Sequence, residues 1–136
     1  MNIAKPKILI VDDETHIRMI MKAYLAPYDI DVIDTRDGIK ALDIMREQDV
    51  DLVVLDYTMP LMSGQEVLDL MMQDSRLEKI PVIIYTAGGF SQEIETWLRN
   101  TSNIFIKKSN LGDELIPAVE NLLGDKLILL DENTDS

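Results

Sequence analysis

The sequence contains no cysteine, which excludes a disulfide framework and any metal site built from thiolates. A reducing compartment fits this absence, and we expect a cytoplasmic protein. No apolar run approaches the length that spans a bilayer, and the N-terminus lacks the apolar region and cleavage site of a signal peptide. We therefore expect no association with a membrane.

Basic residues are also scarce, because 13 lysines and arginines stand against 25 acidic residues and leave a net charge of −12. No cluster of basic residues is available to replace counterions on a phosphate backbone, so we expect no direct binding of nucleic acid by this domain. The length of 136 residues, with 46% apolar and 28% charged residues, is typical of one globular domain.

Short apolar runs alternate with segments of helical periodicity along the whole chain. The expected strands are residues 7–11, 30–33, 51–55, 80–85 and 103–106, with the second at an edge of the sheet. Each is followed by a segment in which apolar residues recur every three or four positions. Five strands alternating with five helices predict a parallel sheet covered on both faces.

Polar residues follow four of the five expected strands. Because parallel strands end at one edge of their sheet, where ligands bind in open α/β folds, these residues are expected to converge. Each alone is typical of a solvated loop, but together they supply what the transfer of a phosphoryl group to a carboxylate needs. They are three carboxylates, a hydroxyl and an ammonium group: Asp12, Asp13, Asp56, Thr86 and Lys108.

In that reaction Asp56, at the exit of an unbroken apolar run, is the expected nucleophile and forms an aspartyl phosphate. Three neighbouring carboxylates repel one another and require a hard divalent cation, for which we predict Mg²⁺. Lys108 offers a positive charge to one phosphoryl oxygen, and the hydroxyl of Thr86 offers a donor to another.

Four stretches of the chain carry its most specific motifs: residues 8–14 (ILIVDDE), 55–64 (LDYTMPLMSG), 81–87 (PVIIYTA) and 105–108 (FIKK). In this order and at this spacing they resemble the receiver domain of two-component response regulators, over about residues 5–124. The resemblance implies an α/β, flavodoxin-like, doubly wound (βα)5 fold with a five-stranded parallel sheet in the order 2-1-3-4-5.

The resemblance divides the chain and identifies the metal ligands. Residues 1–124 correspond to the receiver domain, and residues 125–136 to an acidic tail that is partly disordered or begins a linker. Asp56 corresponds to the phosphoacceptor. Asp13 and Asp56 resemble direct ligands of Mg²⁺, with the backbone carbonyl of Thr58 as a third ligand and Asp12 acting mainly through water.

The same resemblance implies a switch built from Thr86 and Phe105. On phosphorylation the hydroxyl moves toward the phosphoryl oxygen and the aromatic ring turns inward, which changes the face of the fourth helix, fifth strand and fifth helix. Lys108, rather than Lys107, falls at the lysine position of the family.

The function implied is that of a phosphoacceptor switch in a two-component system or phosphorelay. Such a protein is a regulator and not an enzyme, apart from its self-catalysed phosphorylation and dephosphorylation. The implied donor is a histidine kinase or a histidine phosphotransfer protein, and the switched face would bind a downstream protein. A monomer or a weak, phosphorylation-dependent homodimer is expected.

Two alternatives stay open, namely a phosphorylation-independent interaction module on the same fold and the receiver fragment of a larger, multidomain regulator. In the second case the apolar Leu127–Leu130 would begin a linker. A phosphatase with an Asp nucleophile is disfavoured, because it needs an acid/base Asp two residues later and Thr58 stands there.

Two positions depart from the family pattern. Ser109 stands where a proline usually follows the lysine, so we expect a trans bond with a reshaped loop or a cis bond at a cost of roughly 2.5–4 kcal/mol. Pro117 falls within the last expected helix, so that helix either begins near Asp113 or is kinked. The only histidine, His16, is expected to be exposed and without a role in the site.

Overall fold

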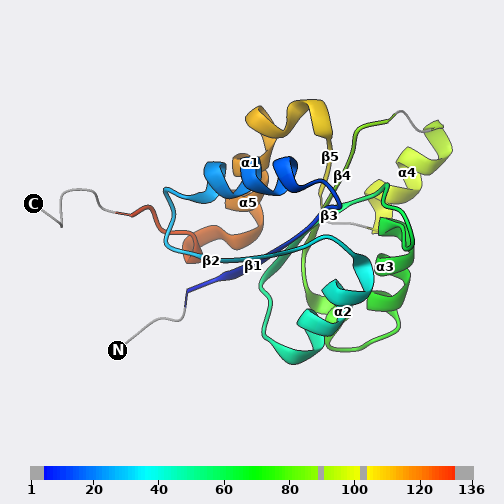
Figure 1. Ribbon diagram of the computed structural model, residues 1–136, viewed down its shortest axis with the longest axis horizontal. Coiled ribbons are helices and arrows are strands. Elements are labelled where there is room, and N and C mark those ends of the chain that lie inside the picture. Colours follow the sequence, from blue (N-terminus) through cyan, green and yellow to red (C-terminus); the bar gives the residue numbers. More distant parts are fainter. Residues whose placement is uncertain (1–4, 89–90, 102–103, 131–136) are drawn as a thin grey trace, which may run out of the picture.

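The structure is a computed structural model that describes residues 5–88, 91–101 and 104–130. All five strands are parallel and lie in the order β2-β1-β3-β4-β5, which confirms the predicted fold (Figure 1). As predicted, β2 is an edge strand. The strands are β1 (Lys7–Val11), β2 (Asp31–Thr35), β3 (Leu52–Asp56), β4 (Val82–Thr86) and β5 (Ile104–Lys107).

Helices cover both faces of the sheet, with α1 and α5 on one side and α2 and α3 on the other (Figure 1). The described residues form the helices α1 (Thr15–Leu25), α2 (Gly38–Glu47), α3 (Gly64–Met72), α4 (Gln92–Thr101) and α5 (Leu111–Leu123). They also form the 3₁₀ turns η1 (Leu77–Lys79) before β4, η2 (Lys108–Asn110) before α5 and η3 (Gly124–Lys126) after α5.

Alternating strand residues enter two separate hydrophobic cores. In β1, for example, Leu9 and Val11 pack toward α2 and α3, whereas Ile8 and Ile10 pack toward α1 and α5. The strand residues of both cores are almost fully buried, and each such aliphatic side chain contributes roughly 1.5–3 kcal/mol. The central strands are therefore rigid, and they hold the residues at their carboxyl ends in fixed positions.

Of the two alternatives for the last helix, the start near Asp113 is wrong and a proline inside the helix is observed. The helix begins at Leu111, so Pro117 lies inside it and removes one backbone hydrogen bond. The preceding turn is η2, and the described residues contain no cis peptide bond, so the trans alternative with a reshaped loop at Ser109 is the one observed.

The apolar tail segment folds back on the domain. The N–H of Leu130 donates to the carbonyl of Pro27 at 2.8 Å, and the N–H of Asp29 donates to the carbonyl of Ile128 at 2.7 Å. The rest of the predicted acidic tail, residues 131–136, lies outside the described residues, as does Asn103 of the expected fifth strand. No helix in the described part of the chain is long and apolar enough to cross a membrane.

Candidate functional site

The predicted polar residues lie at the carboxyl edge of the sheet. Carboxylate oxygens of Asp12, Asp13 and Asp56 all lie within 4.8 Å of one another. The ammonium nitrogen of Lys108 lies 3.2 Å from Asp12 Oδ2 and 3.6 Å from Asp56 Oδ2. Lys107, by contrast, is exposed. Four of the five residues singled out by the sequence therefore form one cluster.

Asp56 is the last residue of β3, and it is only 2% exposed. The N–H of Thr58 donates to Asp56 Oδ1 at 3.1 Å. The loop that follows Asp56 turns back toward the end of β3, where the N–H of Gly64 donates to the carbonyl of Tyr57 at 2.9 Å. A Cβ atom at Gly64 would lie 2.5 Å from the carbonyl oxygen of Asp56, so only glycine allows this close approach.

The environment of Asp56 disfavours its charged form. Burial, followed by the charge of Asp12, raises the pKa of Asp56 to about 7, against the opposing effects of Lys108 and the N–H of Thr58. A carboxyl group with this pKa gains from a nearby cation, because the cation favours the ionised form that a nucleophile must have.

Asp12 is fully buried and is held on both of its carboxylate oxygens. Oδ1 accepts from the N–H of Glu14 at 2.7 Å, and Oδ2 accepts from the hydroxyl of Tyr85 at 2.6 Å. The guanidinium of Arg18 donates to the backbone carbonyl of Asp12 at 2.7 Å and to Asp34 Oδ2 at 2.8 Å. The main chain and the side chain of Asp12 are thus both fixed.

Lys108 contacts a further carboxylate, because its nitrogen lies 3.0 Å from Glu14 Oε1. Burial alone would lower the pKa of Lys108, but the hydrogen bond to Glu14 and the charges of Asp56 and Asp12 outweigh burial and raise it. The hydrogen bond to Lys108 in turn lowers the pKa of Glu14. Lys108 is therefore a permanent cation shared among three carboxylates.

Thr86 ends β4 at the same edge and is 2% exposed. Its hydroxyl oxygen accepts from the N–H of Gly88 at 3.3 Å, so the side chain is engaged with its own loop. Phe105 on β5 is paired with Ile84 on the neighbouring strand β4. Its ring lies on the face of the sheet that also bears Thr86 and packs within the core. The guanidinium carbon of Arg99 lies 5.0 Å from the centre of the Phe105 ring.

The cluster fits a small divalent cation. A cation that is 2.0–2.6 Å from each oxygen ligand keeps those ligands within roughly 4–5 Å of one another, as the three carboxylates are. A donor set made only of carboxylate oxygens suits Mg²⁺ better than a soft metal. Asp12, Asp13 and Asp56 are the residues that could hold the ion, and the ligand role of the Thr58 carbonyl stays a prediction.

Sequence reasoning missed Tyr85, Glu14 and Arg18. A tyrosine in a strand of otherwise aliphatic residues is a usable signal, because a buried hydroxyl needs a partner. The contacts of Glu14 and Arg18 depend on side-chain directions that the sequence pattern does not reveal. His16 is exposed, as predicted, with its Nε2 3.5 Å from Glu14 Oε2.

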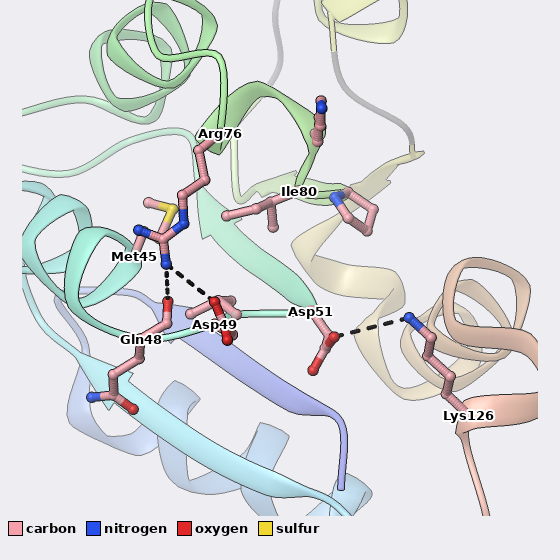
Figure 2. A pocket seen from close by; sticks show the side chains of 10 residues that line it. Met45, Gln48, Asp49, Asp51, Arg76, Ile80 and Lys126 are labelled. Atoms are coloured by element: carbon pink, nitrogen blue, oxygen red, sulfur yellow. Dashed lines mark hydrogen bonds and ion pairs between the residues drawn. The ribbon is translucent and has the colours of Figure 1, made fainter. Parts of the chain in front are cut away.

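A separate cavity of about 270 Å³ lies at the opposite, amino-terminal end of β3 (Figure 2). Three basic residues, Arg76, Lys79 and Lys126, line it together with acidic ones. The guanidinium of Arg76 lies 3.2 Å from Asp49 Oδ1 and 2.8 Å from the carbonyl of Arg46. It therefore secures the end of α2. The ammonium nitrogen of Lys126 lies 4.0 Å from Asp51 Oδ1. Arg76 and Lys126 thus have acidic partners within the domain, and the cavity lies at the other end of β3 from the carboxylate cluster.

Residues 8–120 match the family described as the response regulator receiver domain. The chain belongs to this family. Receiver domains are signalling regulators rather than classical enzymes, and histidine kinases or phosphotransfer proteins phosphorylate them.

Similar proteins cover almost the whole receiver domain. A chemotaxis protein CheY homolog of Campylobacter jejuni is 31% identical over 120 residues, which cover 87% of this chain and 92% of that protein. The polar-differentiation response regulator DivK of Brucella ovis is 30% identical over 118 residues, covering 87% and 96%. The solved structure of response regulator protein TrrA from Thermotoga maritima in complex with Mg²⁺-BeF has a TM-score of 0.75 and 30% identity, covering 87% and 99%.

Proposed function

We propose that this receiver domain is a phosphoacceptor switch in which Asp56 accepts a phosphoryl group from a phosphohistidine. The donor is a histidine kinase or a histidine phosphotransfer protein. The observation that carries this proposal is the convergence of Asp56 with two further carboxylates and with Lys108, whose nitrogen lies 3.6 Å from Asp56 Oδ2. An ordinary cluster of surface acids would not bury its central carboxylate to 2% exposure.

In the proposed transfer, a carboxylate oxygen of Asp56 forms a bond to phosphorus as the bond from phosphorus to the donor imidazole breaks. The imidazole nitrogen keeps the electron pair of that bond and takes a proton. Lys108 leaves its present carboxylate partners to neutralise a phosphoryl oxygen. The rigid end of β3 holds the attacking oxygen in place.

Mg²⁺ is the cofactor we propose, held directly by Asp13 and Asp56 with the Thr58 carbonyl, and through water by Asp12. When bound, it offsets the negative charge of the carboxylates and of the phosphoryl group. The fit of the three carboxylates to a small cation supports this, as does the Mg²⁺-BeF complex of the related TrrA. The elevated pKa of metal-free Asp56 is a further reason for a cation at this point.

The output of the switch is proposed to begin at Thr86. Its hydroxyl would leave the N–H of Gly88 and donate to a phosphoryl oxygen, because the aspartyl phosphate presents a stronger acceptor. The ring of Phe105 already packs in the core, so the first movement we propose is that of the Thr86 loop. This movement changes the face of α4, β5 and α5, which binds the downstream protein.

We also propose that residues 1–124 form the receiver unit and that residues 125–136 are an appended acidic segment. Leu130 and Ile128 make backbone hydrogen bonds to the loop between α1 and β2. We expect the unit to be a monomer, or a homodimer that is weak and needs phosphorylation. Light scattering before and after phosphorylation measures this directly.

Intact-protein mass spectrometry tests the proposed function. Incubation with acetyl phosphate and Mg²⁺ should add the mass of one phosphoryl group to the wild type, and Asp56→Asn should abolish the gain. Asp69→Asn is the matched control, because Asp69 is an exposed carboxylate on α3 and should leave the gain unchanged. A wild type that gains no mass, or an Asp56→Asn variant that gains it fully, favours the phosphorylation-independent interaction module.

A further inference from the structure

Tyr85 is a polar residue placed inside a hydrophobic strand. It is fully buried among the side chains that face α1 and α5, and its neighbours Ile83 and Ile106 belong to the same core. A buried phenol needs a partner for its hydroxyl. Tyr85 finds that partner in Asp12 Oδ2, at the short distance of 2.6 Å.

Asp12 Oδ2 has a second partner in Lys108, at 3.2 Å. The two donors differ in rigidity. Tyr85 stands on the central strand β4 with its ring packed in the core, whereas Lys108 has a long side chain that also reaches Glu14 at 3.0 Å and Asp56 at 3.6 Å. Lys108 can exchange these carboxylates, whereas Tyr85 keeps its position.

This difference matters once Lys108 turns toward a phosphoryl group on Asp56. Asp12 is fully buried, and without Tyr85 the departure of Lys108 would leave Oδ2 with no donor among the described residues. A buried carboxylate that loses a hydrogen-bond donor is strongly destabilised and changes its orientation. The aromatic ring of Tyr85 also lies near Lys108, whose nitrogen is 5.5 Å from the ring centre, and so attracts the ammonium weakly.

We propose that Tyr85 is a positioning residue, which holds the Asp12 carboxylate in the cation-binding arrangement independently of Lys108. The acidic cluster therefore stays assembled while Lys108 moves from Asp12 to the phosphoryl group. This inference rests on the proposed function for the movement of Lys108. The hold of Tyr85 on Asp12 is a property of the unphosphorylated protein and can be measured without any phosphodonor.

Tyr85→Phe tests the inference, because it removes the hydroxyl and leaves the ring in the core. Isothermal titration calorimetry without phosphodonor should show a dissociation constant for Mg²⁺ that is about three- to tenfold higher than that of the wild type, since loss of one hydrogen bond to a charged group has a modest effect on affinity. Tyr24→Phe is the matched control, because Tyr24 lies on α1 and is 39% exposed. The control should bind Mg²⁺ as the wild type does.

A second measurement separates positioning from plain packing. With acetyl phosphate, the Mg²⁺ concentration for half-maximal phosphorylation of Tyr85→Phe should rise by the same factor, while the rate at saturating Mg²⁺ changes by less than about twofold. In an Asp12→Asn background, Tyr85→Phe should have no further effect on Mg²⁺ binding. Unchanged Mg²⁺ affinity in Tyr85→Phe, with or without lost stability, would mean that Tyr85 only fills the core and overturns the inference.

A structure of the wild type tests the inference in a way that does not depend on the folding of any variant. A crystal structure of the phosphorylated, Mg²⁺-loaded protein should keep the Tyr85–Asp12 hydrogen bond while the Lys108–Asp12 distance lengthens. Loss of the Tyr85 bond there overturns the inference alone. If the wild type accepts no phosphoryl group but Tyr85→Phe still binds Mg²⁺ more weakly than the wild type does, the proposed function is overturned and the hold on Asp12 is established.

Discussion

The ammonium nitrogen of Lys108 lies 3.0 Å from Glu14 Oε1, which makes Glu14 its nearest carboxylate partner. The side chain of Lys108 is 11% exposed and that of Glu14 is 46% exposed, so the pair stands at the rim of the site. In the proposed transfer, Lys108 gives up this contact to reach a phosphoryl group on Asp56. Under that proposal, Glu14 competes with the phosphoryl group for Lys108.

Replacement of Glu14 by glutamine should accelerate phosphorylation. The variant Glu14→Gln removes the charge that attracts Lys108 and one negative charge near the incoming phosphoryl group. We expect the rate with acetyl phosphate to rise about two- to fivefold, while the free energy of unfolding changes by less than about 1 kcal/mol because the pair is partly exposed. Glu120→Gln, an exposed position on α5, is the control. An unchanged or slower rate would show that Glu14 does not restrain Lys108.

The stability of the metal-free protein should depend on pH through Asp56. The folded state raises the pKa of Asp56 from 3.8 to about 7, so between these values the folded state binds the proton more tightly than the unfolded chain. The stability from this group is complete below about pH 4 and is lost as the pH rises through 7. Asp56→Asn resembles the neutral acid, so at pH 8 it should be more stable than the wild type by about 1–3 kcal/mol.

Urea unfolding with a chelator from pH 5 to pH 8 measures this difference, which should shrink as the pH falls. Added Mg²⁺ should stabilise the wild type at pH 8, because it binds the ionised folded state, and should stabilise Asp56→Asn much less. Asp69→Asn should follow the wild type under both conditions. Equal stability of wild type and Asp56→Asn at pH 8 without metal would contradict a buried, destabilising charge at this position.

The convergence of the polar residues at the site could be predicted because each lies at the end of an apolar run or within two residues of it. Asp12 and Asp56 are ordered by β1 and β3, so a parallel sheet was enough to bring them together. Pro117 left two alternatives for α5, and the structure shows the one with the proline inside the helix, which begins at Leu111. The sequence could not decide between them, because the packing of α5 against the sheet depends on the whole fold. The Tyr85 side chain on β4 reaches Asp12, just after the end of β1. The spacing of apolar residues along the sequence cannot predict such a contact.

Gly64 should resist substitution because of the acceptor loop. In Gly64→Ala the new Cβ would meet the carbonyl oxygen of Asp56 at 2.5 Å and Cα of Tyr57 at 2.7 Å, and both are backbone atoms that cannot move alone. We expect a loss of about 2–4 kcal/mol in the free energy of unfolding and slower phosphorylation, because the end of β3 must shift. A Cβ at Gly88 meets nothing within 4 Å, so Gly88→Ala should unfold at nearly the wild-type urea concentration. Equal stability of Gly64→Ala and Gly88→Ala would contradict the close approach of the backbone at Gly64.

Pro117 should lower the stability of the domain, since it lies inside the 13-residue helix α5 and is exposed. In Pro117→Ala the new N–H can donate to the carbonyl of Asp113, and alanine is about 3 kcal/mol more favourable than proline in a helix interior. Greater freedom of the unfolded chain offsets roughly 0.4–1 kcal/mol of this gain. We expect a net stabilisation of about 2–2.5 kcal/mol and a melting temperature higher by several degrees, measured by circular dichroism.

Pro27→Ala is the informative control for this change, because Pro27 lies in the loop after α1 and outside any helix. There the loss of proline only frees the unfolded chain, so stability should fall slightly, by up to about 1 kcal/mol. The two proline variants should therefore shift the melting temperature in opposite directions. If Pro117→Ala instead loses stability as Pro27→Ala does, the proline stands in the first turn of the helix. The helix would then begin near Asp113 in solution, as the sequence alone allowed.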